Sequence, residues 1–257
     1  MNLPAQTFAA DTFDAAFSSN RLLATLSDEE RALLLPHMRS ASFEAGERVF
    51  GVGSPVDRSV FPFGNLMVSM MVELREGRSV EVASIGKEGA IGGIVSCGAA
   101  PAFTDAVVQI AGPALEMPLE ALQQVKQASA HLHSLFCRYS DYLLSQVMQS
   151  VACNSFHPFE ARAARWLLQA QDRVGGEQIA LTQEALAGLL GVQRTTLNAV
   201  ARVLQDQGLI AYRRAAIQVA DRNGLARVAC ECYRTVEEHF TSVLGADGRG
   251  GAAASCA

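Results

Sequence analysis

Short apolar runs interrupted by glycine dominate the chain between about residues 42 and 119. The clearest pair of runs covers residues 68–74 and 79–83, both rich in valine and methionine or alanine. The intervening residues 75–78, Arg-Glu-Gly-Arg, contain the glycine of a tight turn, so the pattern predicts a β-hairpin. Because turn signals recur every ~8 to 12 residues, we expect a small antiparallel sandwich or barrel.

The segment before these runs has two different textures. Residues 1–20 mix alanine, serine and phenylalanine with two aspartates, which is typical of a loosely attached arm. Ser27 then precedes a helical pattern, and Glu30 stands three residues later, the spacing of a capping box. Pro36 lacks the amide proton that a helix interior needs, so we expect the helix to break there.

From about Gln123 onward the apolar positions follow a helical period. Five of them lie at steps of four, three, four and four residues and form one stripe: Leu132, Phe136, Tyr139, Leu143 and Val147. The stripe continues without glycine or proline until Pro158, which predicts one long connecting helix. We expect the stripe to form a dimer interface with a second copy of the chain. Packing of this helix on the chain's own barrel is the alternative.

The most informative pattern lies between Thr182 and Arg214. Thr182 can cap one helix, Ala187 is small where two helices must approach closely, and Gly191 suits the positive φ of a tight interhelical turn. In the following helix the apolar residues fall on one side and the polar residues on the other. This combination predicts a helix-turn-helix, and a short hairpin from Ala211 to Val219 follows it as a wing.

The polar side of the second helix has the residue types that read DNA. Arginine can clamp guanine and asparagine can clamp adenine, while threonine and glutamine contact phosphates or bases. The wing adds arginines that are placed to contact phosphate, and the segment carries a local charge of +2. We therefore expect DNA contacts from Gln193, Arg194, Thr195, Thr196, Asn198, Arg202, Arg213 and Arg214.

Composition limits the remaining possibilities. The chain has 257 residues, 49% of them hydrophobic, and a formal net charge of −5. A globally basic protein that coats nucleic acid or membrane is thereby excluded. No uncharged run without glycine or proline reaches the ~18 to 20 residues that cross a bilayer, and no basic residue precedes Arg21 as a secretory signal would require. We expect a soluble, cytoplasmic protein with no membrane partner.

Six cysteines are spread along the chain without a C-x-x-C pair. Cys230 and Cys232 could form a redox pair, and His133 with Cys137 could share a helix face as metal ligands. Neighbouring cysteines on a helix point apart, however, and two ligands without a third do not make a metal site. We expect reduced, mostly buried thiols and no metal.

From about Leu22 to Phe240 the chain resembles the Crp/Fnr superfamily of bacterial transcription regulators. The motifs that carry the resemblance lie at residues 44–47, 80–82, 86–89, 191–196, 208–210 and 229–233. The resemblance implies an α+β fold with an N-terminal antiparallel β-roll of the cyclic-nucleotide-binding type. The expected division is an arm at 1–20, the β-roll at 21–127, a dimerisation helix at 128–156, a winged helix-turn-helix at 157–240 and a disordered tail at 241–257.

The chain departs from the family at two sets of positions, so neither the base preference nor the effector of known members can be transferred to it. Members that read DNA with an Arg-Glu-x-x-x-Arg face have glutamate where this chain has Thr195 and arginine where it has Ala199, so the base preference cannot be transferred. Members that bind cyclic AMP have a Gly-Glu pair where this chain has Gly92 and Gly93, and a later arginine where it reads Phe-Thr-Asp at 103–105. We expect no cofactor and do not expect cyclic AMP as effector. The iron–sulfur branch clusters cysteines near the N-terminus, whereas the first cysteine here is Cys97.

The sequence therefore predicts a homodimeric regulator that binds an inverted-repeat site in double-stranded DNA, with RNA polymerase as a further candidate partner. The alternative is a small-molecule-binding regulatory protein that acts through a protein partner. A protein interface on the second helix would favour apolar or aromatic residues, which argues for DNA. We find no catalytic motif and expect no enzymatic activity.

Overall fold

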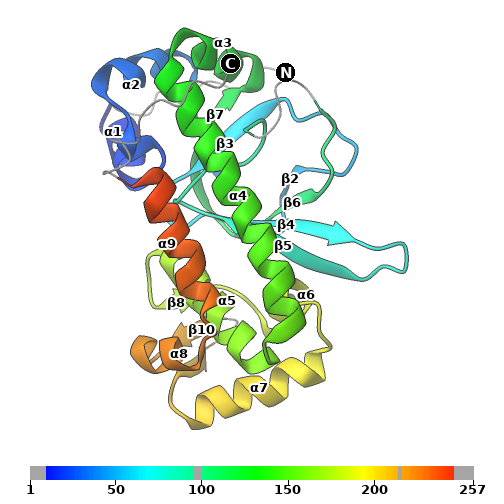
Figure 1. Ribbon diagram of the computed structural model, residues 1–257. Coiled ribbons are helices and arrows are strands. Elements are labelled where there is room, and N and C mark those ends of the chain that lie inside the picture. The colour runs from blue at the N-terminus through cyan, green and yellow to red at the C-terminus, as the bar shows by residue number, and fades with distance from the viewer. Residues whose placement is uncertain (1–9, 95–99, 214–215, 246–257) are drawn as a thin grey trace.

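A computed structural model describes residues 10–94, 100–213 and 216–245. The long helix α4 (Ala130–Phe156) runs through the molecule, with a β-roll beside one end and a small helical domain at the other (Figure 1). Helix α9 (Cys232–Leu244) lies along α4 and returns the chain toward the β-roll (Figure 1). The expected α+β fold is confirmed. None of the helices in the described ranges combines the length and hydropathy needed to cross a bilayer.

The N-terminal segment differs from the loosely attached arm expected for residues 1–20. Helix α1 (Ala10–Ser19) forms there, and Ala16 and Phe17 are buried in the core beneath the β-roll. The physical reason is the apolar spacing of Phe13, Ala16 and Phe17, which places all three on one helical face. The expectation was therefore wrong for the described residues of this segment.

The predicted capping box at the next helix is present. In α2 (Asp28–Leu34) the Ser27 hydroxyl accepts from the Glu30 amide, and the Glu30 carboxylate accepts from the Ser27 amide. Pro36 lies in a 3-10 turn (Leu35–His37) that ends the helix. Both outcomes follow from local hydrogen bonding, which is why the sequence could predict them.

Two antiparallel sheets form the β-roll. One has the strand order β1-β7-β3 and the other β2-β6-β4-β5. The hairpin predicted around residues 75–78 joins β4 to β5, with Val72 opposite Val80. Apolar side chains from both sheets fill the space between them, among them Phe43, Val60, Val68 and Val108. The strands are β1 (Arg39–Phe43), β2 (Arg48–Phe50), β3 (Arg58–Pro62), β4 (Met67–Glu73), β5 (Ser79–Ile85), β6 (Asp105–Ile110) and β7 (Gly112–Pro118).

Helix α3 (Leu119–Ala128) leads into α4, whose first turn is capped by the Ser129 hydroxyl. The apolar stripe of α4 packs largely on the chain itself. Leu132, Phe136 and Tyr139 are completely buried, and the Tyr139 hydroxyl donates to the carbonyl of Ala90 in the β-roll. The alternative of packing on the chain's own barrel is thus the observed arrangement for these three residues.

The C-terminal domain begins with α5 (Phe159–Val174), which ends at Gly175 with φ +71°. Its sheet has the order β8-β10-β9, and its core includes Trp166, Leu186, Leu197 and Ile217. The remaining elements are β8 (Gln178–Ile179), α6 (Gln183–Leu189), α7 (Arg194–Asp206), β9 (Ile210–Arg213), β10 (Ala216–Val219) and α8 (Arg222–Val228).

The expected start of the disordered tail at residue 241 was wrong, because helix α9 extends beyond it. It continues through residues 241–244, which were expected to belong to a disordered tail, and Leu244 is buried. Its apolar face joins the core of the N-terminal half, where the Phe240 ring lies 4.9 Å from the Tyr142 ring of α4 between centroids. The remainder of the expected tail, residues 246–257, lies outside the described residues.

Candidate nucleic-acid interface

The helix-turn-helix is built by α6, a tight turn and α7. The Thr182 hydroxyl caps α6 by accepting from the Ala185 amide at 3.1 Å. Gly191 adopts φ +66°, a conformation that side chains with a Cβ rarely adopt. The Val192 amide then donates to the Ala187 carbonyl at 3.0 Å and closes the turn. Each of the three residues that predicted this motif from sequence has its expected place.

Helix α7 has an apolar back and a polar front. Leu197, Ala201 and Leu204 are buried in the domain core. Seen in Figure 1, α7 lies along the outer edge of the C-terminal domain. The polar side chains expected to contact DNA are all exposed or half-buried on this helix or at its start: Gln193, Arg194, Thr195, Thr196, Asn198 and Arg202. Among them, Arg202 forms an exposed ion pair with Asp206 at 4.0 Å.

The start of α7 adds further donors to this front. Gln193 is the N-cap residue, but its side chain makes no capping hydrogen bond. The first amides of a helix have no hydrogen-bond partner within the helix. These amides and the positive end of the helix dipole both favour binding of phosphate oxygens. Arg194 therefore lies beside backbone groups that suit a phosphate.

The wing is the β9–β10 hairpin. Arg213 lies at the end of β9 with an exposed side chain, opposite Ala216 in β10. Arg214, which was expected to contact phosphate as well, lies outside the described residues. One of the two wing arginines is thus found where the sequence analysis expected it.

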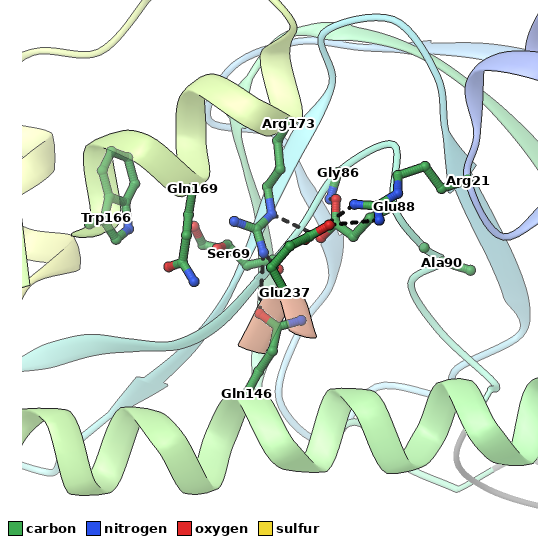
Figure 2. Close-up of polar contacts among 12 residues, drawn as sticks. Arg21, Ser69, Gly86, Glu88, Ala90, Gln146, Trp166, Gln169, Arg173 and Glu237 are labelled. Carbon is green, nitrogen blue, oxygen red and sulfur yellow. Dashed lines mark hydrogen bonds and ion pairs between the residues drawn. The ribbon is translucent and has the colours of Figure 1, made fainter. Parts of the chain in front are cut away.

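A buried polar cluster connects this domain to the β-roll, and sequence reasoning missed it. Arg173 of α5 donates to the carboxylate of Glu88 at 2.8 Å, to the Ser84 carbonyl at 3.0 Å and to the Gln146 side chain of α4 at 3.2 Å. Figure 2 shows Arg173 reaching between Gln146 and Glu88. Trp166 of the same helix donates to the carboxylate of Glu81 at 2.8 Å. Partners about 85 residues apart leave no local sequence signal.

The outward face of α4 is apolar in its second half. Leu144, Met148 and Val151 are 51%, 62% and 64% exposed and lie four and three residues apart. This spacing places them on one side of the helix. Of the five residues expected to form a dimer interface, Leu132, Phe136 and Tyr139 are buried within the chain, whereas Leu143 and Val147 are half-buried. The expectation was therefore wrong for Leu132, Phe136 and Tyr139, which cover the chain's own core, and it stays a prediction for Leu143 and Val147.

The turn of the β-roll that would correspond to a phosphate site is closely packed. Gly93 has φ +66°, and a Cβ there would approach the Leu119 side chain to 2.2 Å. Asp105, near the position of a phosphate-binding arginine in relatives that bind cyclic AMP, is buried. Its carboxylate pairs with Arg48 at 3.3 Å and accepts from the Val52 amide.

The four cysteines within the described residues are free, and three of them are buried, as expected from the sequence. Nδ1 of His133 lies 3.7 Å from the sulfur of Cys137 on an exposed part of α4. Cys230 and Cys232 instead meet Cys153 and His157 in a compact, largely buried group of four. This group of four was not predicted from the sequence, because its two halves are more than 70 residues apart.

Comparison with known proteins bears on the C-terminal domain and on the whole fold. Residues 161–228 match the family model of the Crp-like helix-turn-helix domain. The structure of FixK2 from Bradyrhizobium japonicum superposes with a TM-score of 0.65 at 16% identity, covering 75% of this chain and 98% of that one. A search of curated protein sequences finds no match.

Two further solved structures have the same architecture. The c-di-GMP responsive global regulator CLP from Xanthomonas campestris has a TM-score of 0.61 at 18% identity and covers 76% of this chain and 100% of its own. A CRP-family transcriptional regulator from Thermus thermophilus also has a TM-score of 0.61 at 18% identity, with 74% and 96% covered. The C-terminal part of the chain is therefore a Crp-like helix-turn-helix domain, and the chain as a whole has the fold of Crp/Fnr-type transcription regulators.

Proposed function

We propose that this protein is a homodimeric transcription regulator that reads a specific site in double-stranded DNA with α7. The observation that carries the proposal is the exposed polar front of α7 on an apolar back. Arg194 and Asn198 offer the paired hydrogen-bonding groups that base edges in the major groove require. The Arg213 side chain in the wing supplies positive charge for the phosphate backbone.

The exposed face of α4 supports dimerisation. Three large apolar side chains in a row, Leu144, Met148 and Val151, are unfavourable in water and suit the same face of a second copy. A twofold dimer would present two α7 helices to successive turns of the major groove. The site should then be an inverted repeat whose half-sites lie about 34 Å apart. Contact with RNA polymerase stays a prediction.

We further propose that the β-roll does not respond to cyclic AMP. A buried cyclic phosphate needs a cation or an array of strong donors to replace its water. The carboxylate of Asp105 brings a negative charge to this region, and Arg48 is already paired with it. The packing of Gly93 against Leu119 also leaves no room for a larger residue at that turn.

Selection of bound sequences from random DNA tests the proposal. The full-length protein should enrich one inverted-repeat motif, and a variant in which Arg194 and Asn198 are both alanine should not. A circular dichroism spectrum that matches the unmodified protein would show that this variant is folded. No enrichment by the unmodified protein, or equal enrichment by the variant, would exclude sequence reading by α7.

A further inference from the structure

Four metal-binding side chains converge where α4, α8 and α9 meet. Cys153 lies in the last turn of α4, His157 ends that helix, Cys230 follows α8 and Cys232 begins α9. Their sulfur and ring nitrogen atoms all lie within 4.8 Å of one another. In Figure 1 the end of α4 and the beginning of α9 lie at the same end of the molecule. The group thus combines two segments that are more than 70 residues apart.

Two distances within the group are close to the edges of a metal-centred tetrahedron. The sulfur atoms of Cys153 and Cys230 are 3.5 Å apart, and the Cys232 sulfur lies 3.4 Å from Nδ1 of His157. Bond lengths of ~2.3 Å from zinc to sulfur and ~2.0 Å to nitrogen give a sulfur–sulfur edge of about 3.8 Å and a sulfur–nitrogen edge of about 3.5 Å. A disulfide would need ~2.05 Å between sulfurs, and these three cysteines are free thiols.

The donor set and its burial select the metal and the type of site. Three sulfur atoms and one imidazole nitrogen suit Zn²⁺, whereas Mg²⁺ and Ca²⁺ require oxygen ligands. Cys153 and Cys232 are completely buried and Cys230 is 7% exposed. His157 is half-buried, but four protein ligands complete a tetrahedral coordination and leave no position for water or substrate. That arrangement is typical of structural zinc rather than catalytic zinc.

The surroundings orient the ligands. Nδ1 of His157 faces the thiols, while Nε2 lies 3.2 Å from the Glu231 carboxylate. A carboxylate on the far nitrogen fixes the ring of a metal-binding histidine with its lone pair toward the metal. Gln149 donates to the Cys232 sulfur at 3.0 Å.

We propose that Cys153, His157, Cys230 and Cys232 bind one structural Zn²⁺ ion. The position of the ion gives it a specific role in the fold. The chain enters the winged-helix domain directly after His157 and leaves it directly before Cys230. An ion at this point would fasten both ends of the domain to the end of α4. It would therefore restrict how far the DNA-reading domain can rotate relative to the proposed dimer helix.

Metal analysis of the full-length protein, expressed without a polyhistidine tag, tests the proposal without reference to DNA binding. Mass spectrometry of the metal content should find about one zinc ion per chain. Cys153→Ser and Cys232→Ser should each lose most of that zinc. Cys137→Ser is the matched control, because Cys137 is an exposed cysteine on the same helix, and this variant should keep its zinc.

A second measurement does not depend on the folding of the cysteine variants. Protein produced with cobalt in place of zinc should show the charge-transfer absorption of thiolates bound to tetrahedral Co²⁺. Absence of both zinc and this absorption would overturn the proposal. So would full zinc content in both serine variants, which would place any metal elsewhere. A disulfide between Cys153 and Cys230 in the intact, freshly purified protein would identify a redox pair instead.

Discussion

Arg173 of α5 and Glu88 of the β-roll form an ion pair of 2.8 Å with side chains only 6% and 7% exposed. The pair connects the helix-turn-helix domain to the segment that follows β5, and Gln146 of α4 joins it from a third direction. A buried charge without its partner is far more costly than an exposed one, because the protein interior cannot replace water. The relative position of the two domains therefore depends on this contact.

Arg173→Met should destabilise the protein by about 3 to 5 kcal/mol, because it leaves the Glu88 carboxylate buried without a cation. Chemical denaturation followed by circular dichroism measures the loss. The second change Glu88→Leu, made in the Arg173→Met background, should recover part of the stability, since no unpaired charge then remains.

Arg78→Met provides the control for this prediction. Arg78 pairs with Glu76 at 2.9 Å, but both side chains are about three-quarters exposed. Exposed pairs contribute roughly 0 to 1 kcal/mol, so this variant should unfold almost like the unmodified protein. Equal losses for Arg173→Met and Arg78→Met would mean that the buried pair has no special role in joining the domains.

Glu81 gives a second test of the same interface through pH. Its carboxylate accepts from Ser69 of β4 and from Trp166 of α5, and burial raises its pKa above the usual value of 4.5. The folded state therefore holds a proton that the unfolded state has lost, and this carboxyl lowers stability as pH rises from 4.5 through the raised pKa. Glu81→Gln should remove that loss, because its amide oxygen can still accept from Trp166 and its amide NH2 can donate to the Ser69 hydroxyl.

The difference between Glu81→Gln and the unmodified protein should be small near pH ~4.5 and larger at pH ~8. It should amount to about 1.4 kcal/mol for each unit by which the folded pKa exceeds the unfolded one. Fluorescence of Trp166, the only tryptophan in the sequence, can follow unfolding at each pH. Glu76→Gln at the exposed hairpin turn is the control. A stability difference that does not change with pH would show that Glu81 does not titrate in this range.

Local signals in the sequence predicted local structure well. The capping box of Ser27 and Glu30 and the turn at Gly191 each depend on residues within a few positions. Hydrogen bonds and backbone angles at such short range are fixed largely by the residues themselves. The exposed front of α7 was predictable for the same reason, because helical spacing separates it from the buried back.

Long-range structure was less predictable. The period of Leu132, Phe136 and Tyr139 shows that one helical face is covered, but it does not show what covers it. The structure places the chain's own core there. Similarly, Arg173 and Glu88 carry no signal in sequence, because charged residues are usually exposed. The spacing of Phe13 and Phe17, by contrast, does indicate the helix α1. The high alanine and serine content of this segment favoured a loosely attached arm instead.

Replacing both Leu144 and Val151 by glutamate should convert the protein from dimer to monomer. Burial of each side chain against a second copy contributes about 1.5 to 3 kcal/mol, and the glutamates would add repulsion across the twofold axis. Sedimentation equilibrium measures the outcome. Leu74→Glu is the control, since Leu74 is 52% exposed beside the β4–β5 turn and should not affect association. A double variant that stays dimeric would place the interface elsewhere.

Cyclic AMP should show no binding in calorimetric titration. The buried carboxylate of Asp105 disfavours a cyclic phosphate in its neighbourhood, and the close packing of Gly93 leaves no room there for a nucleotide-binding side chain. DNA binding should likewise be the same with and without the nucleotide. Micromolar affinity for cyclic AMP would contradict this prediction and would require a phosphate site built from other groups.

Arg194→Ala and Arg213→Ala should weaken DNA binding in two different ways. Arg194 lies in the first turn of α7, where a side chain can reach base edges, and a paired contact with guanine discriminates by about 1 to 3 kcal/mol. Its loss should weaken the selected site much more than random DNA. Arg213 lies in the wing, so its loss should weaken all sequences alike and reduce the salt dependence by about one ion.

Binding titrations over a series of salt concentrations, with the selected site and a scrambled site, separate the two roles of these arginines. Arg78→Ala is the control, because Arg78 is an exposed arginine of the β-roll outside the helix-turn-helix. Arg78→Ala should leave the affinities for both DNA sites unchanged. That result would show that the loss of one positive charge elsewhere on the protein does not by itself weaken DNA binding. If Arg194→Ala lowered the affinity equally for both sites, Arg194 would contact phosphate, and the reading of bases would belong to other residues of α7.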